Sequence, residues 1–231
     1  MTRVGVTQTG ATRLAVFDCD GTLVDGQASI CEAMESAFAG ADLPCPPRAQ
    51  VRRIVGLSLP QALVRLAPKA SEEQRAQIVG GYKSAFFNAR TEGRLSEPLF
   101  EGMRELLHRL HQAGWLLGVA TGKSDRGLTS CLAGHEISEL FVTLQTADRH
   151  PSKPHPAMLE AALFEAGVEA GAAVMIGDTS FDMEMARAAG VRAIGVDWGY
   201  HAPDELLATG ASGVASDMAA LEALLQEPAH G

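Results

Sequence analysis

The sequence predicts an α/β fold, in which a Rossmann-like core with a parallel sheet carries a small all-helical cap domain inserted after the first strand. Three observations lead to this prediction. Short apolar runs recur along the chain and end in polar, glycine-containing loops, as buried parallel strands do. Helical patterns alternate with them, which favours right-handed crossovers. One long stretch, from about residue 27 to residue 94, offers helical patterns only.

The predicted strands share a continuously apolar composition and a polar residue at the carboxyl end. They cover residues 14–17, 115–120 and 172–176, with shorter ones at 140–142 and 193–196. The helices expected around them have apolar residues spaced three and four apart, and they cover residues 103–111, 157–166, 183–189 and 218–225. This alternation of strand and helix defines the core.

The helical stretch reads as an insert because the segments on either side of it are rich in helix-breaking residues. Its expected helices cover residues 30–38, 59–66 and 72–90, and its joints lie at 24–26 and 93–98. We therefore expect a core made of residues 1–24 and 96–231 and a helical cap made of residues 25–95. Because the chain crosses between the two parts twice, a hinged lid is possible.

Composition and charge narrow the class of protein. With 46% hydrophobic and 20% charged residues, the chain has the composition of a globular protein. Its formal net charge of -9 argues against nucleic acid or an anionic membrane as the main partner. No apolar run is long enough to span a membrane, and residues 1–10 lack the apolar block of a signal peptide. We expect a cytoplasmic monomer or homodimer with reduced cysteines.

Polar residues gather where the predicted strands end. Asp18, Asp20, Thr121 and Asp178 follow three different strands, and Lys153 precedes a helix. Ligands of open α/β sheets bind beyond the carboxyl ends of the strands, so these side chains are expected in one crevice. Each of them alone could equally cap a helix or form a turn, but their coincidence favours a site.

The residue types at this edge suit phosphoryl transfer assisted by Mg²⁺. This cation prefers oxygen ligands and is usually bound by one or two carboxylates together with substrate phosphate. The metal and Lys153 would offset the repulsion between an attacking carboxylate and a phosphate dianion. Thr121 and the backbone amides of Cys19, Gly122 and Lys123 could hold the phosphate oxygens.

Four motifs resemble those of the haloacid dehalogenase (HAD)-like hydrolase superfamily, in its helical-cap subgroup. The first is Asp-Cys-Asp-Gly-Thr-Leu-Val-Asp at residues 18–25, and the second is Thr121 in Ala-Thr-Gly-Lys. The third is Lys153 in Ser-Lys-Pro-His-Pro, and the fourth is Gly-Asp-Thr-Ser-Phe-Asp at residues 177–182. The overall pattern is most similar to phosphoglycolate phosphatases.

The resemblance implies a role for each matching residue. Asp18 would attack phosphorus, and Asp20 would protonate the leaving group and later activate water. Thr121, Gly122 and Lys153 would bind the phosphoryl group. The metal would be held by Asp18, the backbone carbonyl of Asp20 and Asp178, while Asp182 would either orient Lys153 or metal-bound water, or ligate the metal directly.

An acid two residues after the nucleophile favours phosphoryl transfer over halide displacement, because only an alkoxide leaving group benefits from a proton. Together with this preference, the resemblance to phosphoglycolate phosphatases implies a Mg²⁺-dependent phosphatase that acts on a small, phosphoglycolate-like metabolite. The alternatives are a phosphomutase of the β-phosphoglucomutase type, a pyrophosphatase, and a non-catalytic phosphate-binding module.

Substrate selection is expected in the insert, where the sequence is less explicit. Residues 56–60 resemble the family's substrate-selecting cap loop, although an ordinary helix–helix turn is an equal alternative. Asp25 either steers the lid or caps the next helix. Four basic residues are candidate anion contacts or solvated side chains, namely Arg52, Arg53, Arg65 and Lys83.

Overall fold

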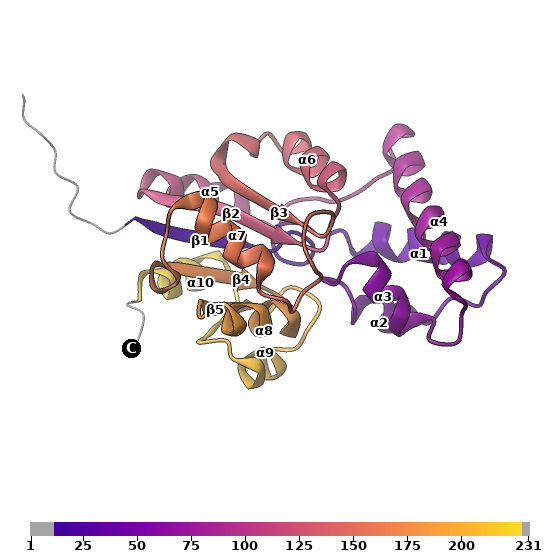
Figure 1. The fold of residues 1–231 in the computed structure, drawn as a ribbon. Helices are drawn as coiled ribbons and strands as arrows, with labels where there is room; N and C mark the ends of the chain where they lie inside the picture. Colours follow the sequence, from indigo (N-terminus) through magenta and orange to yellow (C-terminus); the bar gives the residue numbers. More distant parts are fainter. Residues whose placement is uncertain (1–11, 228–231) are drawn as a thin grey trace, which may run out of the picture.

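The computed structural model describes residues 12–227 and is built on a six-stranded parallel sheet (Figure 1). The strands lie in the order β3-β2-β1-β4-β5-β6. Their bounds are β1 (Arg13–Phe17), β2 (Trp115–Thr121), β3 (Phe141–Thr146), β4 (Ala173–Gly177), β5 (Arg192–Val196) and β6 (Val214–Ala215). Since the strand order reverses between β1 and β4, a binding crevice is expected where these two strands end. Residues 1–10, on which the signal-peptide interpretation depended, lie outside the described part.

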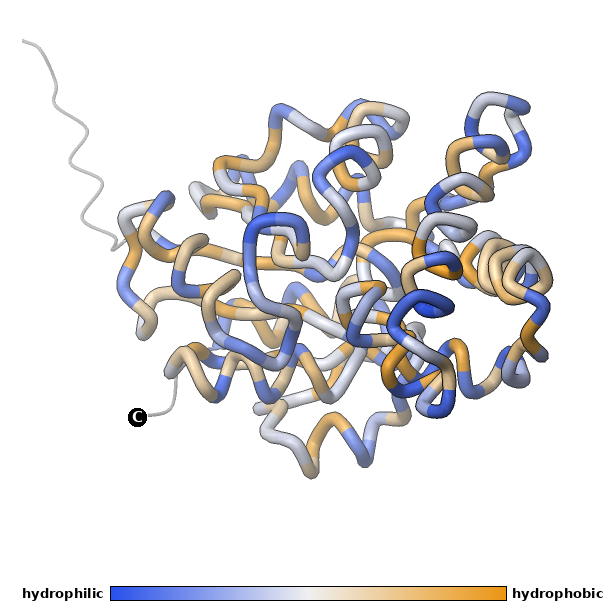
Figure 2. Tube along the Cα trace, turned by 45° about the vertical axis from the view of Figure 1, so that its right-hand side comes forward, coloured by the Kyte–Doolittle hydropathy of each residue, from blue (hydrophilic) through white to orange (hydrophobic). Residues whose placement is uncertain are grey.

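Helices cover both faces of the sheet, and the side chains of β1 show how the two cores separate. Ala15 and Phe17 face the cluster formed with α5 (Met103–Gln112), α6 (Asp125–Gly134) and α10 (Met218–Gln226). Leu14 and Val16 face the cluster formed with α7 (Ala157–Ala166), α8 (Ser180–Ala188) and α9 (Pro203–Thr209). All four side chains are fully buried, so β1 is the centre of a three-layer core. Figure 2 shows the hydrophobic positions along the central strands and the hydrophilic ones in the outer loops.

The helical insert, by which we mean α1–α4, lies beyond the carboxyl ends of the strands (Figure 1). It consists of α1 (Gln27–Gly40), α2 (Arg48–Arg52), α3 (Leu59–Leu66) and α4 (Glu72–Thr91). A separate apolar cluster that includes Met34, Phe38, Leu63 and Ile78 holds these helices together. The insert therefore has its own small core, placed directly over the edge where the polar residues gather.

The structure confirms the predicted fold class and adds four helices and strands to it, together with two short 3-10 helices, η1 (Ser138–Leu140) and η2 (Ala170–Ala172). α2, α6, α9 and β6 were not predicted, and two of them are short, at five and two residues. α8 begins at Ser180 rather than at the predicted residue 183, because Thr179 and Asp182 form a capping box that closes the first turn. This earlier start matters because it fixes the side chain of Asp182. Among the described residues, no helix has the length and apolarity needed to cross a membrane.

Candidate active site

The loop that follows β1 holds two carboxylates at the centre of the sheet edge. Asp18 is fully buried and Asp20 is 8% exposed. The loop turns back on itself through hydrogen bonds from the amides of Leu23 and Val24 to the carbonyl of Cys19, at 2.9 and 3.0 Å. Gly21 allows this turn because its φ is +85°, and a Cβ there would lie 2.2 Å from the carboxylate of Asp178. The tight loop thus brings the first motif against the fourth.

Asp18 has one bonded and one unbonded carboxylate oxygen. Its Oδ1 accepts a hydrogen bond from the amide of Cys19 at 2.6 Å and lies 3.0 Å from the Nζ of Lys153. Its Oδ2 is buried and has no hydrogen-bond partner among the described residues. Burial raises the pKa of Asp18 from 3.8 to about 7, although the cation of Lys153 opposes the rise. An unpartnered buried oxygen of this kind leaves room for a ligand that the protein itself does not supply.

Three buried carboxylates converge at this point and fit a divalent cation. Asp18, Asp178 and Asp182 each offer an oxygen within 4.8 Å of the others. Asp178 accepts hydrogen bonds from the hydroxyl of Thr22 at 2.8 Å and from the amide of Tyr200 at 2.9 Å. Burial, together with the neighbouring carboxylates, raises the pKa of Asp178 well above its usual range. Such a cluster has the hard oxygen donors that Mg²⁺ prefers.

Lys153 is the cation that the protein provides to this cluster. Its Nζ is fully buried and lies 2.6 Å from Oδ1 of Asp182, in addition to its contact with Asp18. Burial opposes the charge of Lys153, but the two carboxylates raise its pKa above the ordinary value. Asp182 is held from its other side, where Oδ2 accepts hydrogen bonds from the amide and hydroxyl of Thr179 at 3.1 and 2.7 Å. Both oxygens of Asp182 are thus engaged, and one of them orients Lys153.

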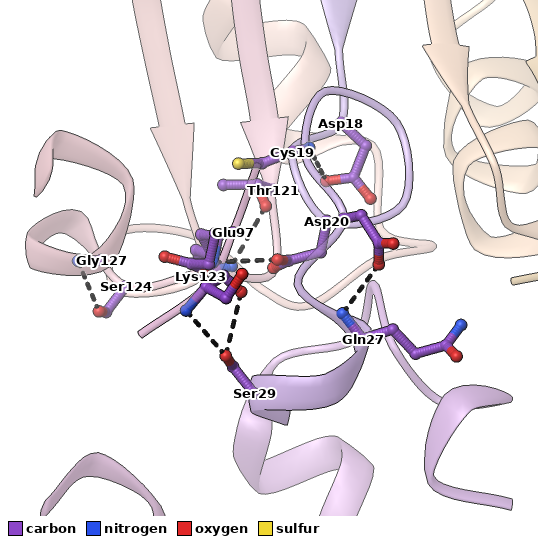
Figure 3. A network of polar contacts seen from close by, with 12 residues as sticks. Asp18, Cys19, Asp20, Gln27, Ser29, Glu97, Thr121, Lys123, Ser124 and Gly127 are labelled. Carbon is purple, nitrogen blue, oxygen red and sulfur yellow. Dashed lines mark hydrogen bonds and ion pairs between the residues drawn. The ribbon is translucent and has the colours of Figure 1, made fainter. Parts of the chain in front are cut away.

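Asp20 is directed toward a second, partly buried lysine, Lys123 (Figure 3). The Nζ of Lys123 lies 3.0 Å from Oδ1 of Asp20 and also pairs with Glu97. Burial raises the pKa of Asp20, and the positive charge of Lys123 limits the rise. The sequence did not single out this pairing, because Glu97 comes from the joint after α4 and only the fold brings it here.

Thr121 and Gly122 lie at the carboxyl end of β2, next to Lys123. Thr121 is 1% exposed, and its hydroxyl accepts a hydrogen bond from the amide of Lys123 at 3.3 Å. Gly122 touches the helical insert so closely that a Cβ there would lie 2.6 Å from the carbonyl oxygen of Leu57 and 2.7 Å from that of Gly56. The four segments that carry the predicted site residues therefore meet, and the insert loop at residues 56–60 faces them.

That insert loop is fastened to the core by three kinds of contact. The amide of Ser58 donates a hydrogen bond to the hydroxyl of Ser152 at 2.8 Å, next to the segment that carries Lys153. Leu57 packs with Phe181 of α8 in a small buried cluster. His201 joins α8 to the insert, because its Nδ1 accepts from the amide of Ser180 at 3.1 Å and its Nε2 lies 3.2 Å from the carbonyl oxygen of residue 53. The loop therefore joins α2 to α3 and also contacts the core.

The basic residues of the insert have mostly structural partners. Arg52 donates to a side chain of α1 at 2.9 Å, and Arg53 pairs with a glutamate of α9 at 2.6 Å. The guanidinium of Arg65 lies 5.0 Å from the centre of an aromatic ring in α8. Lys83 is the one of the four that lines the cavity between insert and core. Asp25 accepts a hydrogen bond from the first amide of α1 at 3.2 Å, while Gly26 is the N-cap residue of that helix.

A cavity of about 440 Å³ lies between the helical insert and the core. From the core, its lining includes Asp20, Gly122 and Lys123, whereas Asp18 is not part of it. Asp20 thus stands between the buried Asp18 and the open space. A molecule that fills the cavity would contact Asp20 with its outer part and would have to direct its reacting group past it toward Asp18.

The chain is similar in sequence and in structure to known proteins. A family model described as haloacid dehalogenase-like hydrolase matches residues 15–196. A protein from Dickeya dadantii named Probable phosphatase IndB is 34% identical over 197 residues, which cover 84% of this chain and 85% of that protein. A phosphoglycolate phosphatase from Vibrio vulnificus is 30% identical over 218 residues, covering 90% and 94% of the two chains. Among solved structures, a haloacid dehalogenase-like hydrolase from Streptococcus pneumoniae superimposes with a TM-score of 0.80 at 26% identity, over 93% of this chain and 99% of that one.

Proposed function

Because the chain belongs to the haloacid dehalogenase-like hydrolase family, we propose that it is a Mg²⁺-dependent phosphatase. It hydrolyses a small phosphorylated metabolite through an aspartyl-phosphate formed on Asp18. The observation that carries the proposal is the different position of two neighbouring carboxylates. Asp18 is fully buried and paired with Lys153, while Asp20, two residues later, lines the cavity.

In the first step, a carboxylate oxygen of Asp18 forms a bond to phosphorus as the bond from phosphorus to the substrate's ester oxygen breaks. Asp20 gives its proton to that ester oxygen, so an alcohol leaves. In the second step, a water molecule transfers a proton to Asp20 and its oxygen attacks phosphorus. The bond between phosphorus and Asp18 then breaks, and inorganic phosphate is released. Burial raises the pKa of Asp20, which is the direction that a general acid requires.

The remaining residues hold the reacting groups in place. Asp18, Asp178 and the backbone carbonyl of Asp20 would bind Mg²⁺, which when present neutralises charge on the phosphoryl group. Lys153 contributes a second positive charge beside Asp18, and Asp182 keeps it there. The hydroxyl of Thr121 and the amide of Gly122 would bind the phosphoryl oxygens.

The helical insert would serve as the cap over this site. Residues 25–95 contribute the loop that contacts Gly122 and most of the cavity wall, so they would select the substrate and limit the access of water. Phosphoglycolate is the reference substrate for the first assay, because the Vibrio vulnificus relative carries that name.

The test is a panel of phosphomonoesters assayed for phosphate release with Mg²⁺ and with a chelator. We expect turnover with Mg²⁺, loss of turnover on chelation, and no turnover by Asp18→Asn. Asp204→Asn, which alters an exposed carboxylate outside the cavity, is the matched control and should retain activity. Activity near the wild-type level in Asp18→Asn would refute the proposal. Conversion of a sugar phosphate to its isomer without phosphate release would indicate a phosphomutase instead.

A further inference from the structure

The cavity over the candidate active site has a mostly apolar wall. The helical insert supplies the side chains that dominate it, namely Ile30, Met34, Ile54, Leu59, Tyr82 and Phe86. Its volume of about 440 Å³ lies in the range of pockets that enclose ligands of drug-like size, about 300–1,000 Å³. Glycolate, an acid of two carbons, would fill only a small part of it and would leave the apolar wall in contact with water.

Two aromatic rings of α4 form the most specific part of this wall. The rings of Tyr82 and Phe86 are 4.9 Å apart between their centres and are tilted by 37°. The Nζ of Lys123 lies 5.9 Å from the centre of the Phe86 ring, which places this ring beside the ion pair of Asp20. An alcohol released at Asp20 would therefore lie close to Phe86.

A third aromatic ring stands at the outer edge of the cavity. Phe87 lines the cavity and is 42% exposed. The guanidinium of Arg126 lies 4.6 Å from the centre of its ring, so a residue of the core holds the edge of the insert in position. The aromatic surface thus continues from Asp20 to the mouth of the cavity.

We infer that the substrate of this phosphatase is the phosphomonoester of an alcohol that carries a bulky, flat apolar body, such as an aromatic ring. This inference rests on the proposed function and names the class of substrate. The phosphate would lie toward Asp18, and the ring would pack against Tyr82 and Phe86. Stacked or edge-on contact between a substrate ring and these side chains is favourable in addition to the burial of apolar surface.

The test compares benzyl phosphate with ethyl phosphate and phosphoglycolate, in the presence of Mg²⁺. Benzyl and ethyl alcohol are both primary, so the chemistry of the leaving group is closely matched. We expect kcat/KM for benzyl phosphate to exceed that for ethyl phosphate by about tenfold or more, the advantage that burial of a phenyl ring provides.

Variants locate the effect in the cavity. Phe86→Ala should reduce the ratio of kcat/KM for benzyl phosphate to kcat/KM for ethyl phosphate by about three- to tenfold. Phe164→Ala is the control. Phe164 is 88% exposed on α7 and does not line the cavity, so its variant should keep the wild-type ratio. Phe87→Ala, at an exposed position, tests the same wall should Phe86→Ala fail to fold.

The outcomes separate the inference from the proposed function. Efficient hydrolysis of all three esters with a ratio near one, or a clear preference for phosphoglycolate, would overturn the inference and leave the phosphatase in place. The inference would also be overturned if the ratio stayed at the wild-type value in both Phe86→Ala and Phe87→Ala, because the preference for benzyl phosphate would then not arise from the aromatic wall of the cavity. Failure to release phosphate from any ester would remove the proposed function, and the inference with it.

Discussion

Adding Mg²⁺ is expected to stabilise the protein more at pH 8 than at pH 6. The reason is the pKa of Asp18, which burial raises from 3.8 to about 7 in the metal-free protein. That rise corresponds to about 4 kcal/mol of disfavour for the carboxylate form. The metal requires the carboxylate, so its binding has to displace a proton at the lower pH and not at the higher one.

The sign and the size follow from the same pKa. Metal-free folded protein holds the Asp18 proton to higher pH than unfolded protein does, so this residue's contribution to stability is lost as the pH rises from about 4 to about 7. About a tenth of Asp18 is ionised at pH 6 and about nine tenths at pH 8, which raises the apparent affinity for Mg²⁺ about tenfold. A tenfold gain is about 1.4 kcal/mol, or about 3–5 °C in Tm for a chain of this size.

Differential scanning calorimetry provides the measurement. Tm is recorded at both pH values with MgCl₂ at a concentration well above its Kd at either pH, and with a chelator at matched ionic strength. The increase in Tm on adding Mg²⁺ should be larger at pH 8 by the stated amount, and Asp18→Asn should reduce the difference because its amide does not titrate. An increase that is equal at the two pH values, or larger at pH 6, would refute the reasoning.

Three further predictions concern the neighbours of Asp18. Asp20→Asn should slow hydrolysis of alkyl phosphates by about 10²–10⁴-fold but that of 4-nitrophenyl phosphate much less, and an equal loss measured by steady-state kinetics would contradict its role as the acid. Lys153→Met should lower the free energy of unfolding by about 3 kcal/mol in urea titrations, because it leaves two buried carboxylates without their cation; unchanged stability would contradict this. Gly122→Ala should reduce kcat/KM by about tenfold or more, because its Cβ would displace the insert loop. Gly134→Ala, where a Cβ would meet nothing within 4 Å, should not.

The core of the fold was predictable because its strands are apolar throughout. The runs before Asp18 and Asp178 are buried on both faces of the sheet, and continuous hydrophobicity is the clearest signal of such strands. β6 is a two-residue strand and α2 a five-residue helix, and neither is long enough to show a period. Tertiary contacts decide such short elements, so the sequence could not predict them.

Some residues of the candidate site could be predicted from local sequence patterns, and others could not. Asp18, Asp178 and Lys153 lie in short polar segments whose residue types already indicate chemistry. The pairing of Lys123 with Asp20 and Glu97 joins three segments that are distant in the chain, and no local pattern encodes it. The aromatic wall of the cavity depends on which face of α4 turns inward, which only the packed structure establishes.

The central claim is that phosphate is transferred to Asp18. Rapid acid quenching during turnover, followed by peptide mass spectrometry, measures this directly. We predict a phosphorylated peptide that carries the modification on Asp18, present with the wild-type enzyme and absent with Asp18→Asn. Steady turnover with no phosphate on the protein, or with phosphate on another residue, would contradict the account.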